Sequence, residues 1–123
     1  MIKGIGCDII EVARIEKALK KPGFAKEVFT TKEIEYSKTR GAHMAESFSA
    51  RYAAKEAVGK AFGEGLNIGN LLEIEVINDI KGMPEIKLFG LMLEKAKTLG
   101  VKKIHISLSH VKEYAMAQVV LED

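Results

Sequence analysis

The sequence has little cysteine, tryptophan or proline, and it lacks long hydrophobic runs. Its 123 residues include one cysteine, no tryptophan and two prolines. Because Cys7 is the only cysteine, no disulfide can form within the chain, which suits a reducing compartment. No apolar run approaches the ~20 residues that span a bilayer, so we expect no membrane insertion. The N-terminus lacks the features of a secretory signal, and the expected location is therefore cytoplasmic.

The chain also has little net charge of either sign. Lysines and arginines number 19 and acidic residues 17, which leaves a net charge of +2. That value is too small to indicate a nucleic-acid-binding protein, and an aromatic content of 7% gives little support for base stacking. A nucleotide- or RNA-binding module is the alternative, but Gly4 and Gly6 lack the third glycine of the dinucleotide fingerprint. No phosphate-loop motif occurs either.

What the sequence does contain is typical of one globular domain. Hydrophobic residues make up 47% of the chain and charged residues 29%, which favours a soluble protein. A chain of this length should bury roughly two-thirds of the surface that its unfolded form exposes. We find no repeat, linker or low-complexity segment, and therefore expect a single domain over residues 1–123.

A buried strand is expected at the N-terminus, over residues 2–10. Alternation places Gly4, Gly6 and Asp8 on one face, and Ile5, Cys7 and Ile9 on the other. Cys7 is then expected in the core, where a thiol packs as a small apolar group. A nucleophilic Cys7 is the alternative, although it has no second cysteine and no local histidine partner.

An amphipathic helix is expected next, over residues 11–21, and it should end at Pro22 and Gly23. Its basic residues lie nearly opposite its apolar stripe. They are Arg14, Lys17 and Lys21. Such a basic face is usually only a solvated surface, and it becomes a docking surface only if the partner is acidic.

Two further helices are expected before residue 63. The first begins at Thr30 or Thr31, with Glu33 placed as in a capping box, and runs towards Thr39. The second is long, from about residue 45 to 62, and has a stripe of small residues that would let another backbone approach closely. The stripe consists of Ala50, Ala54, Ala57 and Ala61.

The remaining segment is expected to consist mainly of strands. Gly63 and Gly65 follow the long helix, either as C-terminal caps or as points of close approach to a nucleotide. The expected elements are strands at 72–77, 85–89, 103–109 and 115–121 and a helix at 91–99. The predicted fold class is α/β (α+β), with a largely antiparallel sheet packed against the long helix.

Two carboxylates carry the functional hypothesis, although each is ordinary by itself. Asp8 could simply cap the helix that begins after Glu11. Glu56 lies one helical turn before Lys60, so a surface ion pair would explain both residues.

Three separated segments change this interpretation, because together they resemble the holo-acyl-carrier-protein synthase class of phosphopantetheinyl transferases. The segments are Gly-Ile-Gly-Cys-Asp-Ile at 4–9, the run at 48–62 with its core Lys55-Glu56-Ala57, and Ile-Ser-Leu-Ser-His at 106–110. Length, order and spacing agree with the family over the whole chain. Cys7 stands where an aliphatic residue is more usual.

The resemblance implies transfer of 4′-phosphopantetheine from coenzyme A to a serine of apo-acyl carrier protein in fatty acid biosynthesis, with release of adenosine 3′,5′-bisphosphate. Asp8 and Glu56 would bind Mg²⁺ on the pyrophosphate, since this cation takes one or two carboxylates, phosphate oxygens and water. Lys60 would place its ammonium beside the phosphate. Glu56, water held by the cation or another base could take the serine proton.

Further contacts follow from the same resemblance. His110 and Arg51 would contact phosphates of coenzyme A, and the turn at Pro84 would lie near adenine. His105 is interpreted as structural, and His43 has no motif support. The acidic carrier protein would dock on the basic helix face, with Arg14 as first choice.

The resemblance also implies a homotrimer with each active site at a protomer boundary. The residues Asp8, Glu56 and Lys60 should then cluster within one chain. Some coenzyme A contacts would come from a neighbouring chain.

Overall fold

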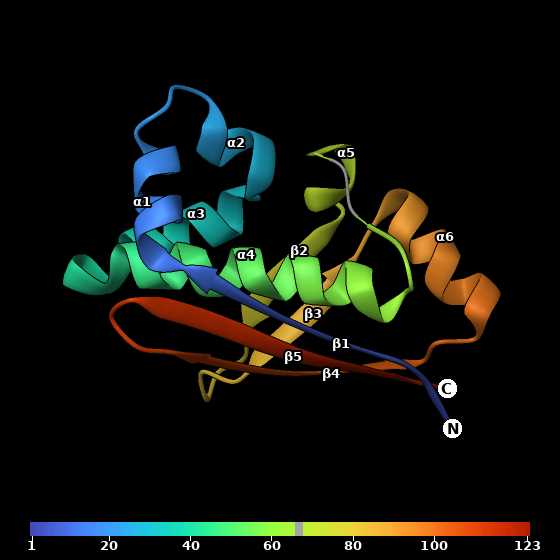
Figure 1. Cartoon of the computed structure of the whole chain (residues 1–123). Coiled ribbons are helices and arrows are strands. Elements are labelled where there is room, and N and C mark those ends of the chain that lie inside the picture. The colour runs from blue at the N-terminus through green and yellow to red at the C-terminus, as the bar shows by residue number, and fades with distance from the viewer. Residues whose placement is uncertain (66–67) are drawn as a thin grey trace.

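The computed structural model describes residues 1–65 and 68–123 and forms a layered α+β domain (Figure 1). Its elements, in chain order, are β1 (Ile2–Glu11), α1 (Val12–Leu19), α2 (Phe24–Val28), α3 (Thr31–Lys38), the 3₁₀ turn η1 (Gly41–His43), α4 (Met44–Ala61), α5 (Ile68–Leu71), β2 (Ile74–Asn78), β3 (Pro84–Leu88), α6 (Gly90–Leu99), β4 (Lys103–His110) and β5 (Tyr114–Glu122). The predicted class is confirmed. Among the described residues, no helix is both long enough and apolar enough to cross a membrane.

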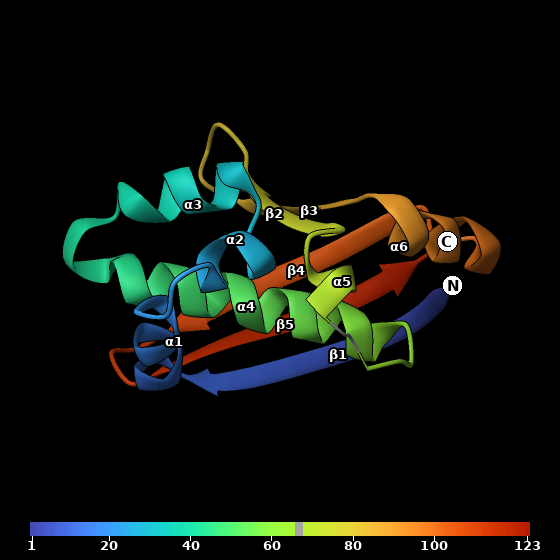
Figure 2. The same cartoon turned by 90° about the horizontal axis from the view of Figure 1, so that it is seen from above.

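The strands form two antiparallel sheets. The larger has the order β1-β5-β4, and the smaller pairs β2 with β3. Helix α4 lies across one face of the larger sheet (Figure 2), and most of its residues are buried. The expected antiparallel pairing is confirmed, but the expected single sheet consists of two hydrogen-bonded units. Strands β1 and β4 lie at opposite edges of the larger sheet, which separates the residues that each strand contributes.

Strand β1 packs directly on the small-residue stripe of α4. An added Cβ at Gly6 would lie 2.1 Å from the carbonyl oxygen of Ala57, and one at Gly4 would lie 2.1 Å from that of Ala61. Both distances are far below van der Waals contact, and the obstacle is backbone in each case. The stripe therefore does what its small residues predict, since it brings the β1 backbone against the helix. Asp8 follows Gly4 and Gly6 on this same face of the strand.

The opposite face of β1 corrects the expectation of a buried strand. Ile5 is 64% exposed and Ile9 67% exposed, and Cys7 between them is also exposed. The prediction of Cys7 in the core is therefore wrong for the single chain. A strand at a sheet edge with one helix above it has only one face covered, and apolar composition alone does not reveal which face that is.

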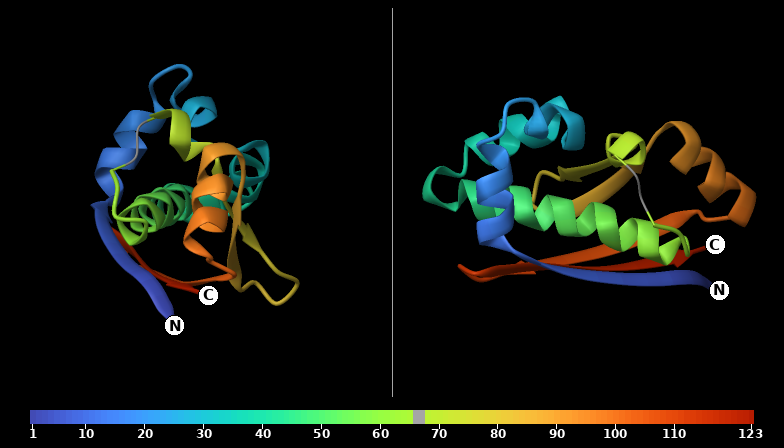
Figure 3. Two further views of the ribbon diagram at one scale, coloured as in Figure 1. Left: turned by 90° about the vertical axis from the view of Figure 1, so that its right-hand side faces the viewer. Right: turned by 45° about the horizontal axis from the view of Figure 1, so that its top comes forward.

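The helical layer on the far side of α4 is built from α1, α2, α3 and α5 (Figures 1 and 3). Thr30 caps α3, and Glu33 completes a capping box with it, as predicted. Helix α1 ends at Leu19 rather than Lys21. Helices α2 and α5 have only five and four residues, and the sequence predicted neither of them. Helices α1 and α3 both contact α4, so this layer helps to hold the long helix in position.

Candidate active site

The predicted acidic pair lies where β1 meets α4. Lys60 donates to Asp8, with Nζ 3.0 Å from Oδ1, so the ammonium pairs with the strand carboxylate rather than with Glu56. Glu56 instead accepts a hydrogen bond from the hydroxyl of Tyr52, one turn earlier on the helix. Asp8 does not cap α1, because Glu11 occupies the N-cap position. The structure thus brings Asp8, Glu56 and Lys60 together within one chain, as the sequence predicts.

The cluster has a net negative charge when both carboxylates are ionised, because Lys60 supplies one positive charge against two negative ones. Burial raises the pKa of Glu56, and the nearby Asp8 carboxylate raises it further. The hydrogen bond from Tyr52 and the charge of Lys60 oppose this shift. Burial and the same two carboxylates raise the pKa of Tyr52. The hydrogen bond to Asp8 raises the pKa of Lys60. A cation between the two carboxylates would relieve their repulsion.

These two carboxylates suit a hard cation that takes only some of its ligands from the protein. Among the described residues, no three side chains of His, Cys, Asp or Glu converge as a metal cage. Asp8 and Glu56 supply two carboxylates, which is what Mg²⁺ typically takes from a protein before phosphate oxygens and water complete its shell. Zn²⁺ would instead call for three or four nitrogen or sulfur ligands. The residues present therefore fit Mg²⁺.

Lys55, the neighbour of Glu56 in the same motif, has a different environment. Its Nζ lies 2.8 Å from Glu33 Oε1, and both side chains are fully buried. It also donates to the carbonyls of Leu71 at 2.8 Å and Ile74 at 2.6 Å. All three ammonium donors are thus used, and Glu33 in turn accepts from the backbone N–H of Val76. Lys55 fastens α4 to α3, to the end of α5 and to the start of β2.

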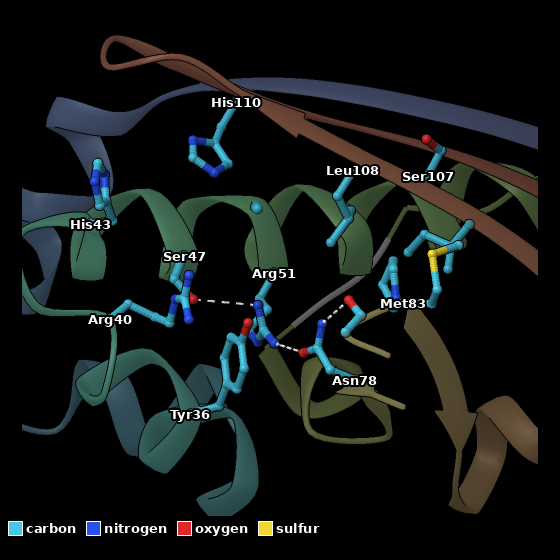
Figure 4. Close-up of a pocket in the computed structure, with 14 residues that line it drawn as sticks. Tyr36, Arg40, His43, Ser47, Arg51, Asn78, Met83, Ser107, Leu108 and His110 are labelled. Atoms are coloured by element: carbon cyan, nitrogen blue, oxygen red, sulfur yellow. Dashed lines mark hydrogen bonds between the residues drawn. The ribbon is translucent and has the colours of Figure 1, made fainter. Parts of the chain in front are cut away.

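A second set of predicted residues lines a cavity of about 550 Å³ on another side of α4 (Figure 4). Its walls come from α3, η1, α4, the β2–β3 turn and β4. They include Tyr36, Arg40, His43, Ser47, Arg51, Asn78, Met83, Pro84, Ser107 and His110. The described residues that line the cavity include two arginines and two histidines, and none of them is a carboxylate. We call this cavity the basic pocket, and it suits an anionic ligand.

Arg51 is the most constrained side chain of the basic pocket. It is 3% exposed, and its guanidinium carbon lies 4.1 Å from the centroid of the Tyr36 ring. One terminal nitrogen donates to Ser47 at 3.3 Å, and the other donates to Asn78. Burial lowers the pKa of Arg51, while Tyr36 and Glu33 oppose that shift. Its Nε is buried and has no hydrogen-bond partner among the described residues, which is unusual for a buried donor.

The predicted site residues therefore fall into two groups. Arg51, Pro84 and His110 line the basic pocket, whereas Asp8 and Glu56 do not. Arg51 and Glu56 are separated by about 140° around α4, given the helical period. His110 and Asp8 lie on strands at opposite edges of the larger sheet.

Gly63 and Gly65 lie outside the basic pocket, at the end of α4. Gly63 has φ of 78° and donates to the carbonyl of Lys60 at 2.9 Å. This is the left-handed cap that commonly ends a helix. The capping interpretation of Gly63 is confirmed. An added side chain at either glycine would meet nothing within 4 Å.

Several residues of the basic pocket could not be found in the sequence. Arg40 and His43 line the pocket, but they belong to the break between two predicted helices and to no motif. Tyr36 and Asn78 are needed because they hold the Arg51 guanidinium. The sequence contained one indication of these partners. Arg51 lies in the motif region, and an arginine that becomes buried there requires polar partners. His105 pairs with Glu122 at 2.9 Å, which agrees with its structural interpretation.

The basic residues of α1 and of the turn that follows it are exposed, as is expected both for a solvated face and for a docking surface. Arg14, Lys17 and Lys21 all lie in solvent. The charge of Arg14 lowers the pKa of Tyr52, which places Arg14 close to the acidic cluster. A partner docked on α1 would therefore stand next to Asp8 and Glu56.

Comparison with known proteins identifies the family. The model of the 4′-phosphopantetheinyl transferase superfamily matches residues 4–119. The chain belongs to this superfamily. It is 47% identical to the holo-[acyl-carrier-protein] synthase of Clostridium tetani over 99% of this chain and 97% of the relative. It is 43% identical to the synthase of the same name from Treponema denticola over 99% of each chain. It is thus an enzyme of the phosphopantetheinyl transferase class.

Solved structures of this superfamily show the same fold. A holo-(acyl-carrier-protein) synthase from Bacillus anthracis, in complex with CoA (3′,5′-ADP), matches with a TM-score of 0.81 and 41% identity over 98% of this chain and 96% of that one. The synthase from Helicobacter pylori, in complex with coenzyme A, matches with a TM-score of 0.81 and 31% identity over 96% and 99%. The fold and the family expected from the three sequence segments are confirmed.

Proposed function

We propose that this chain transfers the 4′-phosphopantetheine group of coenzyme A to a serine of apo-acyl carrier protein and releases adenosine 3′,5′-bisphosphate, in fatty acid biosynthesis. The observation that carries the proposal is the cluster of Asp8, Glu56 and Lys60, because phosphoryl-type transfer requires charge stabilisation of this kind. Relatives named holo-[acyl-carrier-protein] synthase and similar structures that contain coenzyme A support it. A cytoplasmic location is part of the proposal, in keeping with a single cysteine.

Asp8 and Glu56 would hold Mg²⁺ against the pyrophosphate of coenzyme A. Their fit rests on the two carboxylates and on the repulsion between them, which raises the pKa of Glu56. When bound, the cation would neutralise charge that develops on the transferring phosphoryl group. The two carboxylates orient the donor, and α4 and β1 keep them in register through the close contact at Gly6.

Lys60 would change partners when the donor binds. Its ammonium pairs with Asp8 and its side chain is 56% exposed, so the side chain can move at little cost. Occupation of Asp8 by a cation would free this ammonium for a phosphate oxygen. Glu56, solvent water or another nearby base would accept the serine proton.

The basic pocket would hold the nucleotide end of coenzyme A. Arg51 and His110 would bind phosphate, and the turn at Pro84 would lie against adenine. Support comes from the described residues that line the pocket, none of which is a carboxylate, and from the Nε of Arg51, which has no partner among the part of the chain that the structure describes. Gly63 and Gly65 would approach the nucleotide from the end of α4, on the side of the acidic cluster.

We further propose a homotrimer, with each active site at a protomer boundary. One coenzyme A molecule would meet the acidic cluster of one chain and the basic pocket of its neighbour, because the two regions lie on different sides of α4. The exposed apolar face of β1, with Ile5 and Ile9, offers surface for such an assembly. Light scattering should give the mass of three chains, and a fully active monomer would contradict the proposal.

The exposed basic face formed by α1 and the turn that follows it would receive the acyl carrier protein. Arg14, Lys17 and Lys21 would steer a strongly acidic partner and orient its serine toward Asp8 and Glu56. The position of Arg14 beside Tyr52 supports this geometry.

The decisive experiment mixes the purified chain with apo-acyl carrier protein, coenzyme A and Mg²⁺. Mass spectrometry should then show the carrier heavier by one phosphopantetheine group, and chelation of divalent cations should prevent the change. A known synthase of this class, run in parallel, shows that the carrier is competent. An unmodified carrier in the presence of that control would refute the proposed function.

A further inference from the structure

Two histidines converge on one carboxylate oxygen at the edge of the basic pocket. Nδ1 of His43 lies 3.2 Å from Glu46 Oε2, and Nδ1 of His110 lies 2.8 Å from the same atom. The three residues come from η1, α4 and β4. The Glu46 side chain is 13% exposed, against 66% for His43 and 44% for His110. A largely enclosed carboxylate thus anchors two accessible imidazoles, both of which line the pocket (Figure 4).

This geometry fixes where the imidazole protons lie. An ionised carboxylate only accepts hydrogen bonds, so both rings must carry a proton on Nδ1. The nitrogen left to meet a ligand is then Nε2 in each ring. When an imidazole takes a second proton, Nε2 becomes a donor and the ring becomes a cation. Glu46 therefore sets the same tautomer in both rings, so that each ring presents Nε2 to an anion.

We propose that Glu46 is a positioning residue that presents Nε2 of His43 and His110 to a phosphomonoester, whose binding tightens as pH falls. The inference rests on the proposed function. Coenzyme A has one phosphomonoester, on its ribose, in addition to the pyrophosphate assigned to the acidic cluster. Arg40 and Arg51 give the basic pocket two fixed positive charges, and the two imidazoles add up to two more as they take protons.

Arg51 supplies independent support for an anion at this place. The side chain is only 3% exposed, and no described residue partners its Nε. A buried guanidinium donor without an acceptor is costly, and an anionic ligand would satisfy it. The same pocket therefore contains one unsatisfied donor and two imidazoles whose outward nitrogens are free of Glu46.

Other charged groups face Glu46 and belong to the pH dependence. Tyr36 and Arg40 approach the pocket from α3 and its end. On its other side Glu46 lines a separate cavity of about 420 Å³. The charged residues of that cavity are Glu11, Glu16, Lys112 and Glu113. None of these four residues lines the basic pocket. Of the described residues that line the basic pocket, the two histidines are His43 and His110, and these are the groups that would carry added positive charge to a ligand as pH falls.

The first test determines the tautomers by nuclear magnetic resonance. The chain has three histidines, so long-range proton–nitrogen spectra of a ¹⁵N-labelled sample resolve each ring. His43 and His110 should be protonated on Nδ1, whereas His105 should be protonated on Nε2, the atom 2.9 Å from Glu122. In Glu46→Ala, the first two rings should lose this preference while His105 keeps its own. Unchanged tautomers in Glu46→Ala would overturn the positioning role.

The second test compares coenzyme A with 3′-dephospho-coenzyme A, by calorimetry between pH 8 and pH 6. The affinity ratio isolates the phosphomonoester, and for the unaltered protein it should rise about tenfold over this range, as expected for added charge-assisted hydrogen bonds. The ligand phosphate itself titrates near pH 6, but it does so equally for every variant. Glu46→Ala and His43→Gln should flatten the ratio.

Controls separate this inference from the proposed function. His105→Gln changes a histidine outside the pocket and should leave the rise intact, and thermal melts check that each variant folds. If Glu46→Ala keeps the full rise, the inference is wrong even where transfer is normal. If coenzyme A fails to bind at any pH, the proposed function fails first.

Discussion

Lys55 and Lys60 lie five residues apart on α4, and each pairs with a carboxylate, yet their surroundings differ completely. The Lys55 and Glu33 side chains are fully buried, and every ammonium donor has a partner. Lys60 is 56% exposed and donates to Asp8 alone among the described carboxylates. One pair is closed to any further ligand. The other leaves room for a cation, a phosphate and a docking partner.

The comparison separates fold stability from chemistry along one helix. A buried ion pair is costly to break, because the remaining charge has no water to replace its partner. An exposed pair contributes little to stability, and its groups are free to change partners during a reaction. Neighbouring residues of one motif therefore have different roles, since Lys55 stabilises the fold and Glu56 belongs to the candidate active site.

The largest effect is expected from Lys55→Met, which leaves Glu33 buried without its cation. Loss of one partner of a buried pair costs about 3–5 kcal/mol of unfolding free energy. Urea denaturation should show this loss, with the matched Lys60→Met changing stability by less than about 0.5 kcal/mol. Adding Glu33→Gln to Lys55→Met should recover part of the loss. Equal destabilisation by the two methionine variants would show that the buried and the exposed ion pair contribute alike to stability, contrary to this expectation.

Glu56→Gln should show the opposite pattern, with lost turnover and retained stability. We expect kcat/KM for transfer to fall at least about 100-fold, since even the residues that support metal ligands contribute 10–100-fold. The pKa of Glu56 is raised, so ionising it in the folded state costs stability as pH rises above the ordinary glutamate value near 4.3. The variant should therefore melt no lower than the unaltered protein at pH 7, and the two melting temperatures should converge in acid. A large fall in melting temperature would refute this.

Local patterns in the sequence predicted much of this structure. The capping box of Thr30 and Glu33 and the glycine cap at Gly63 depend on a few neighbouring residues, and both are present. The glycine face of β1 and the alanine stripe of α4 match because close backbone approach needs small side chains on both elements. The acidic cluster follows from that packing, since Asp8 continues the same face.

Long-range packing explains what the sequence did not predict. Helices α2 and α5 are too short for a periodic pattern to develop. Lys55 gave no sign of burial, because a lysine is normally exposed unless distant residues supply partners. Arg40 and His43 meet His110 only because α3, η1 and β4 converge. The outward face of β1 is apolar but exposed, because composition alone does not determine which face of an edge strand another element covers.

Arg51 is buried like Lys55, but unlike Lys55 it has one donor, Nε, without a partner among the described residues. Arg51→Lys loses the planar group that stacks on Tyr36 and bonds Ser47 and Asn78. Coenzyme A should bind about tenfold more weakly, which is about 1.4 kcal/mol. Calorimetry measures the affinity, and a thermal melt shows whether the fold is intact. Unchanged affinity in a folded variant would make Arg51 a structural residue of the Lys55 kind.

The smallest effect is expected from Arg14→Glu, on the exposed face of α1. Reversing this charge should raise KM for the carrier protein about fivefold at low salt, near 1 kcal/mol, and leave the fold and coenzyme A binding unchanged. The difference should shrink in high salt, because exposed charges are screened beyond ~10 Å at 0.1 M. Lys97→Glu on α6 makes the same charge change far along the chain, on another exposed helix, and should leave the carrier KM unaltered. Equal effects of the two reversals would assign the carrier's attraction to overall charge and remove Arg14 from the docking surface.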